Sequence, residues 1–144
     1  MLSDKYQFIT DPNPEEIEQI TVLYREAGWW DELDNGYHEL IRHIVSGSHC
    51  FLTVRDGNEI VGMGRAISDR VNDAYIHDVT VFPRFRHQGI GIRIVQEIVG
   101  RLLHDNMRWI GLIAQNNTHA LYRKIGFEKM PLSLPMLLKI DDKQ

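Results

Sequence analysis

The run from Val79 to Gly91, VTVFPRFRHQGIG, constrains the fold of this chain more than any other stretch. Its valines favour extended backbone, and Pro83 removes an N–H group and ends the strand. Apolar side chains then recur at helical spacing, at Ile90, Ile94, Ile98 and Leu102. Between strand and helix, Gly89 and Gly91 let the backbone turn sharply where the first N–H groups of the helix lack partners. This arrangement predicts a site for an anion such as a pyrophosphate.

The spacing of the glycines separates several kinds of phosphate-binding loop. A Gly-x-Gly pair before a helix also occurs in tight turns that bind no ligand, and the run fits neither the dinucleotide fingerprint G-x-G-x-x-G nor the loop G-x-x-x-x-G-K-[ST]. It reads R-x-x-G-x-G from Arg86, preceded by V-x-P, and LYRKIGF follows at residues 121–127. In these two motifs the chain resembles the GNAT superfamily of acyl-CoA-dependent N-acetyltransferases. The resemblance covers about residues 5–140, and its specific part is residues 74–127.

Length and composition bound the class of protein. With 144 residues, 43% of them hydrophobic, the chain is expected to form one domain over residues 1–144. No apolar run is as long as a membrane span, and the N-terminus MLSDKYQF lacks the regions of a signal peptide, so we expect a cytoplasmic protein without membrane contacts. The single cysteine, Cys50, favours a buried thiol over a nucleophile. No Cys/His cluster has zinc spacing, so no metal is expected.

Charge is distributed unevenly along the chain. The net charge of −4 disfavours a nucleic-acid-binding module, which needs clustered Lys and Arg. Acids dominate residues 1–35, where Lys5 and Arg25 are the only Lys or Arg residues, whereas Glu97 is the only acid among the bases of residues 84–101. Any one of these charges could belong to a solvated helix face. The asymmetry favours an anionic cofactor and a cationic second substrate.

Helical and extended patterns alternate along the chain. Strands are expected at residues 6–10, 49–55, 59–67, 74–81 and 109–114, with further strands near Glu128 and at 136–140. Helices are expected at residues 15–27, 37–46, 90–106 and 118–125. The order predicts an α/β (α+β) fold with a mixed central sheet flanked by helices. Exposed edge strands at the C-terminus would favour a homodimer.

The resemblance implies where the co-substrate acetyl-CoA binds. In GNAT domains the strand matching 74–81 splays from the strand matching 109–114, and the pantetheine arm bonds to main chain in the gap. It implies contacts from Val79, Thr80, Val81, Arg86, His87, Gln88, Gly89, Ile90, Gly91, Ile92 and Asn117. The last of these is open, because Gln115 stands where the family carries its asparagine, and Asn117 or Thr118 could instead cap the following helix.

Two residues are predicted to transfer protons. LYRKIGF places Tyr122 where the family carries a tyrosine that protonates the leaving thiolate, although it could be a packing aromatic. His77 resembles a histidine that arylalkylamine acetyltransferases use in proton removal, with Tyr75 at the position of their second histidine. A lone histidine is also often structural, and Asp78 or Glu59 could instead serve as the base through water. By the two-residue period of a strand, His77 is expected on the face of Val79 and Val81, and Asp78 on the other.

The acceptor pocket is expected from the linker at residues 28–37, together with Tyr75. Trp29 and Trp30 beside acids could hold an amine by cation–π and charge attraction, or could pack between helices. Arg65 and Asp69 could line the same cleft. We therefore expect an N-acetyltransferase that moves an acetyl group from acetyl-CoA to a small primary amine by direct attack. The alternatives are a non-catalytic acyl-CoA-binding module and a protein acetyltransferase acting on lysines or N-termini.

Overall fold

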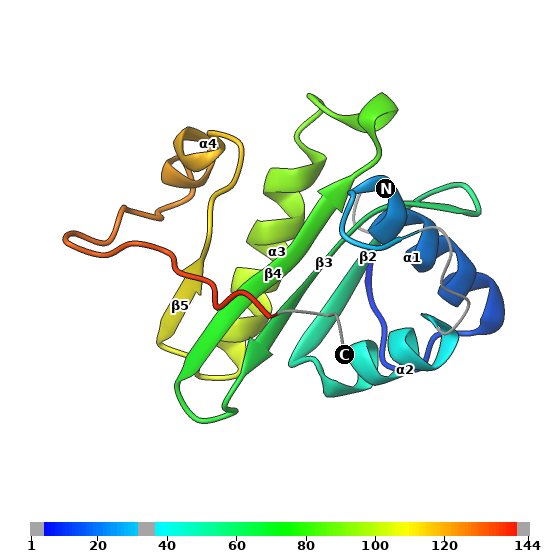
Figure 1. The fold of residues 1–144 in the computed structure, drawn as a ribbon, viewed down its shortest axis with the longest axis horizontal. Coiled ribbons are helices and arrows are strands. Elements are labelled where there is room, and N and C mark those ends of the chain that lie inside the picture. The colour runs from blue at the N-terminus through cyan, green and yellow to red at the C-terminus, as the bar shows by residue number, and fades with distance from the viewer. Residues whose placement is uncertain (1–4, 32–36, 141–144) are drawn as a thin grey trace. The chain divides into compact units, whose positions relative to one another are not determined.

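The computed structural model describes residues 5–31 and 37–140, and residues 32–36 of the predicted acceptor linker lie outside that part. The elements, drawn in Figure 1, are β1 (Tyr6–Phe8), α1 (Pro14–Glu26), α2 (Tyr37–Gly47), β2 (Cys50–Asp56), β3 (Glu59–Ser68), β4 (Asp73–Val81), a 3₁₀ turn (Pro83–Phe85), α3 (Ile90–His104), β5 (Trp109–Leu112) and α4 (His119–Arg123). They group into two compact units divided after Leu112. A single domain over residues 1–144 stays a prediction.

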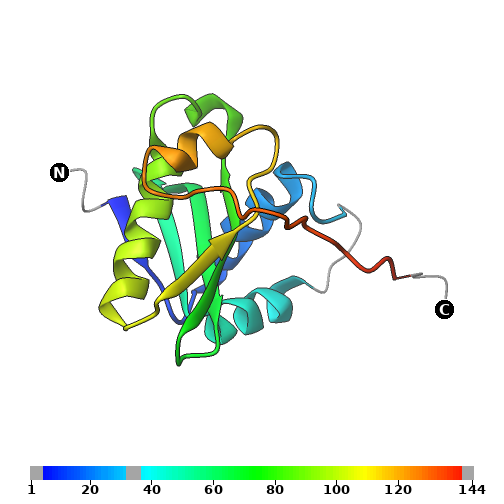
Figure 2. The same cartoon turned by 90° about the vertical axis from the view of Figure 1, so that its left-hand side faces the viewer.

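The first unit is built on a five-stranded sheet in the order β1-β2-β3-β4-β5. Neighbouring strands are antiparallel except β4 and β5, which are parallel because α3 forms the crossover between them. Helix α3 covers one face of the sheet, and α1 and α2 cover the other (Figure 2). The predicted α/β architecture with a mixed sheet is therefore confirmed. No helix among the described residues is long and apolar enough to cross a membrane.

Close packing holds α3 on the sheet. Its buried side chains are Ile94, Val95, Ile98 and Leu102. They lie over Gly64 of β3, where an added Cβ would stand 2.7 Å from Cγ2 of Ile94 and 3.1 Å from Cδ1 of Ile98. Only glycine leaves room for this approach, which fixes the height of α3, and hence of the loop before it, above the sheet.

Strand β4 departs from regular structure in its second half. Its pairing with β5 runs from Asp73 opposite Trp109 to Ile76 opposite Leu112, where β5 ends. Residues 77–81 therefore continue beyond the parallel pairing, and the splay of the central strands stays a prediction. The pairing with β3 also shifts here, because two residue steps on β3 face three on β4. Asp78, with a φ of 56°, lies at this bulge.

The second unit contains α4, and its remaining described residues contain no strand. The strands predicted near Glu128 and at 136–140 are therefore wrong. Pro131 and Pro135 remove ladder donors, and Leu132 has a φ of 57°, which a strand does not accommodate. The prediction of a homodimer, which rested on these strands, stays a prediction without that support.

Candidate functional site

The loop before α3 adopts the conformation that its glycines predict. Gly89 is the N-cap of α3 with a φ of 82°, and His87 has a φ of 63°. No heavy atom lies within 4 Å of a Cβ built on Gly89, and the space around Gly91 holds only a methyl of Val81 at 4.0 Å. The first N–H groups of α3, from Ile90 onward, have no acceptor within the helix. Backbone donors and the helix dipole therefore meet at an open surface, as an anion site requires.

Arginines near this loop are held by other groups of the chain. Nε of Arg86 donates to the carbonyl oxygen of Val81 at 2.9 Å, which ties the loop to the end of β4. Arg84 pairs with Glu59, and Arg93 pairs with Glu97 at 2.6 Å. The positive field expected from residues 84–101 is thus partly neutralised. An anion at this loop would depend mainly on main-chain N–H groups.

The bulge in β4 reverses the predicted face of His77. Val79 and Val81 place methyl groups against the glycines of β3 on the α3 face. His77 pairs with Arg65 in the adjoining strand and, with Asp78, lies on the α1 face. The expectation that His77 shares a face with the valines is wrong because the extra residue interrupts the alternation, whereas Asp78 lies on the face opposite the valines, as expected. Thr80, opposite Met63, also lies on the α1 face.

Asp78 is the centre of a polar cluster on the α1 face. Its Oδ2 accepts hydrogen bonds from the Tyr24 hydroxyl at 2.6 Å and from Nε of Arg65 at 2.7 Å. Its Oδ1 lies 3.0 Å from Nε2 of His77. The Asp78 side chain is 10% exposed and that of His77 is 47% exposed. A buried carboxylate with a cationic partner thus stands beside an imidazole that solvent and ligands can reach.

Aromatic rings connect this cluster to the acceptor linker. The buried ring of Tyr24 stacks on Trp30 at 4.0 Å and meets Trp29 edge-on at 5.9 Å. Burial and the Asp78 carboxylate raise the pKa of Tyr24, so its hydroxyl remains a donor. Trp30 therefore packs against the protein, whereas Trp29 is 40% exposed. The ring of Tyr75 lies 5.7 Å from that of His77, so the structure brings together the predicted acceptor and base residues of the first unit.

Tyr24 and the role of Asp78 were missed by the sequence analysis. A signal existed, because Arg65 and Asp78 are charged residues in otherwise apolar strands, and such residues need partners when buried. Tyr24 carried no signal apart from its place on the buried face of α1. Among the described residues, no group of three or more His, Cys, Asp and Glu side chains is arranged to hold a metal ion.

In the second unit, Tyr122 lies on the short helix α4 and is partly buried. Its ring meets Phe127 edge-on at 6.1 Å, and burial raises the pKa of its phenol, which keeps the proton on it at neutral pH. Thr118 is the N-cap residue of α4, but its hydroxyl donates to the carbonyl of Gln115 and does not cap the helix. Asn117 has a φ of 60° and is not the N-cap, so its cofactor contact stays a prediction.

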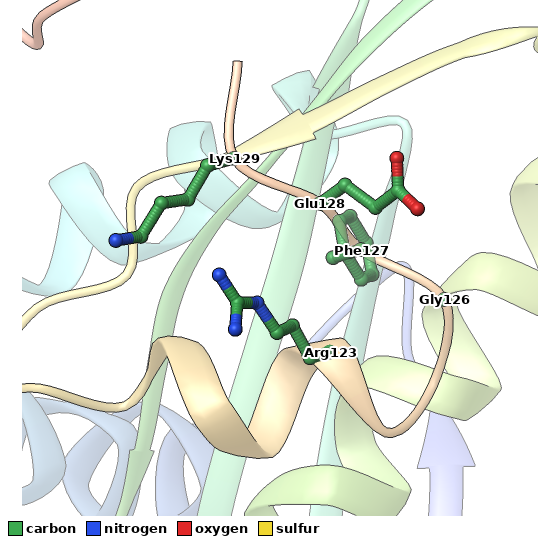
Figure 3. Close-up of a pocket in the computed structure, with 5 residues that line it drawn as sticks. All are labelled: Arg123, Gly126, Phe127, Glu128 and Lys129. Carbon is green, nitrogen blue, oxygen red and sulfur yellow. The ribbon is translucent and has the colours of Figure 1, made fainter. Parts of the chain in front are cut away.

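An open hollow of about 440 Å³ lies in the same unit (Figure 3). Five residues line it: Arg123, Gly126, Phe127, Glu128 and Lys129. The side chains of Arg123 and Lys129 point to the same side of the segment, and Glu128 points to the other. The lining therefore offers two cationic groups on one side.

Known proteins share the sequence pattern and the fold of this chain. The sequence pattern of the Acetyltransferase (GNAT) family matches residues 9–127. A Glycine max protein named histone acetyltransferase TAP1 is 34% identical over 127 residues, which are 81% of this chain and 53% of that protein. The chain thus spans about half the length of this relative.

Solved structures show the same fold. The Staphylococcus aureus protein SA2161, described as a probable acetyltransferase, superposes with a TM-score of 0.75 at 24% identity, covering 94% of this chain and 99% of that one. A Clostridium acetobutylicum acetyltransferase structure with acetyl-CoA superposes with a TM-score of 0.70 at 16% identity, covering 92% and 94%.

Proposed function

This chain belongs to the GNAT acetyltransferase family, and we propose that it transfers an acetyl group from acetyl-CoA to a small primary amine. The observation that carries this proposal is the open, glycine-capped start of α3 together with the half of β4 that continues beyond its pairing with β5. These features supply donors for a pyrophosphate and main-chain groups that a pantetheine amide can pair with. The Clostridium structure with acetyl-CoA adds support for the identity of the co-substrate.

In the proposed cofactor site, residues 86–92 bind the pyrophosphate through their N–H groups, and the main chain of Val79 and Val81 pairs with the pantetheine arm. The valine side chains pack against the α3 face. Pairing with β5 ends at Ile76, so the backbone edge of β4 beyond it has no strand partner on that side among the described residues. Binding at an unpaired strand edge gains main-chain hydrogen bonds without requiring particular side chains.

The proposed chemistry is a direct acyl transfer. His77 removes a proton from the ammonium form of the acceptor, and the amine nitrogen then attacks the acetyl carbonyl carbon. The new C–N bond forms, the C–S bond breaks, and the leaving thiolate takes a proton from the Tyr122 hydroxyl. The attacking nitrogen loses its extra proton to solvent, and solvent returns a proton to the phenolate of Tyr122. The Tyr122 hydroxyl is protonated at the start of each cycle, since burial raises the pKa of its phenol.

The acceptor is proposed to be a small cation. Trp29 offers an exposed indole next to the acidic linker, which suits a protonated amine. The name of the soybean relative favours the second candidate, acetylation of a protein substrate. A module that binds acetyl-CoA without catalysis is the third candidate.

A panel of acceptors with thiol detection separates the three candidates. We would measure CoA release from acetyl-CoA with small primary amines and with a lysine-containing peptide, and record the melting temperature with acetyl-CoA alone. The proposal requires faster thiol release with a small amine. Preference for the peptide would establish the protein acetyltransferase instead, and thermal stabilisation without thiol release from any acceptor would establish the binding module.

A further inference from the structure

We propose that Asp78 is a positioning residue for His77, holding its imidazole in the tautomer that carries hydrogen on Nε2 and leaves the lone pair on Nδ1. This inference rests on the proposed function, in which His77 is the base. It assigns a task to a carboxylate that regular strand alternation would place on the opposite face of the sheet from His77.

The backbone provides the first step of the argument. Consecutive residues in a strand point to opposite faces, yet Oδ1 of Asp78 lies 3.0 Å from Nε2 of His77. The bulge makes this contact possible, with Asp78 at a φ of 56°. Asp and Asn are the non-glycine residues that tolerate this region best, and strained backbone of this kind is held in place by its surroundings.

The hydrogen bonds of Asp78 provide the second step. Its Oδ2 already accepts from Tyr24 of α1 and from Arg65 of β3, and Nη1 of Arg65 is held in turn by Oγ of Ser48 at 3.3 Å. The carboxylate is therefore fixed from three segments, with Oδ1 turned to His77. An ionised carboxylate offers only lone pairs, and its charge at 3.0 Å, within ion-pair distance, disfavours a lone pair on Nε2. The charge of Asp78 thus favours hydrogen on Nε2, which leaves Nδ1 as the basic nitrogen.

The variant Asp78→Asn tests this arrangement by reversing it. Two donors converge on the Oδ2 position, so the amide oxygen of the asparagine must occupy it, and the amide NH₂ then faces Nε2 of His77. That NH₂ forces the hydrogen onto Nδ1, and the base is lost. We expect ¹⁵N NMR of the imidazole to show hydrogen on Nε2 in the wild type and on Nδ1 in Asp78→Asn, with turnover lower by about 10²- to 10⁴-fold.

Tyr24→Phe is the matched control, because it removes one donor to Oδ2 and keeps the contact between Asp78 and His77. It is expected to retain the Nε2 tautomer and to lose less than about tenfold in turnover. A merely structural role for Asp78 predicts that the two variants behave alike and that neither changes the tautomer. That result would overturn the proposal, as would hydrogen on Nδ1 in the wild type, a measurement that needs no variant.

The same experiment distinguishes this inference from the proposed function. If His77→Gln retains the full rate of acetyl transfer while the wild type shows hydrogen on Nε2, the base assignment in the proposed function is overturned and the tautomer assignment is supported. If acetyl transfer depends on His77 but the wild type carries hydrogen on Nδ1, the proposed function is supported and the role of Asp78 is overturned.

Discussion

The candidate sites on the two faces of β4 are built from different chemical groups, main-chain N–H groups on one face and side chains on the other. On the α3 face, Val79 and Val81 pack against glycines of β3, and the polar groups on offer are the N–H groups that open α3. On the α1 face, the site consists of side chains gathered around Asp78. The one-residue bulge in β4 places His77 on the α1 face, opposite the face of the two valines. We infer that main-chain donors suit a cofactor whose phosphates are always the same. Side chains suit an acceptor that can differ between enzymes.

The largest expected effect is a loss of turnover without a loss of acetyl-CoA binding. Tyr122→Phe keeps the ring and its packing against Phe127 but removes the proton donor. Turnover should fall by about 10²- to 10⁴-fold, with the Kd for acetyl-CoA unchanged. Steady-state kinetics and calorimetric titration measure the two quantities. Full turnover with chemistry shown to be rate-limiting would exclude the donor role of Tyr122.

A substitution in the packed layer should affect stability. Gly64→Ala places a methyl 2.7 Å from Cγ2 of the buried Ile94, and we expect a loss of about 1–3 kcal/mol in the free energy of unfolding. Gly100→Ala is the matched control, because it lies in α3 with nothing within 4 Å of its added Cβ, and it should stabilise by about 0.5–1 kcal/mol. Equal effects in urea unfolding would contradict the close approach of α3.

A substitution in the loop should affect cofactor binding. Gly89→Val forces a β-branched residue into a φ of 82° and puts its methyls in the open space before α3. We expect acetyl-CoA to bind at least about tenfold more weakly, or about 1.4 kcal/mol. Calorimetric titration of a folded variant with unchanged Kd would remove the loop from the cofactor site.

The free energy of unfolding should fall at alkaline pH because of the buried phenol of Tyr24 on the α1 face. The pKa of Tyr24 is raised in the folded protein, so above pH 10 the unfolded chain loses this proton first and unfolding is favoured. From this residue we expect a loss of up to about 1.4 kcal/mol per pH unit, which Tyr24→Phe should remove. Urea unfolding at pH 9 and pH 11 tests this, and the same slope in wild type and variant would argue against the buried phenol.

The smallest effect concerns the acceptor. Trp29→Ala should raise the KM for a cationic amine severalfold and leave acetyl-CoA binding intact, because a partly exposed cation–π contact contributes about 0.5–1 kcal/mol. KM should also rise with salt if acids attract the amine. A preferred acceptor that is anionic would contradict the assignment of this face.

The sequence predicted what periodicity and glycine spacing control. Strand β4, the loop at residues 86–91 and helix α3 follow from the alternation of valines, Pro83 and the recurring isoleucines. The face of His77 could not be predicted, because a bulge depends on pairing with β3 and leaves no mark in a period-two pattern. The last strands were wrong because Pro131 and Pro135 remove ladder donors from this segment. The partners of Arg65 and Asp78 come from contacts distant in sequence, which local patterns do not contain.

NMR titration of the wild type tests the division between the two faces most directly. Acetyl-CoA is expected to move the backbone amide signals of Gly89, Ile90 and Gly91 and to leave the indole N–H of Trp29 in place. A small amine added next is expected to move that indole signal and leave the loop amides. Acetyl-CoA that moves the indole of Trp29 without moving the loop amides would contradict the account.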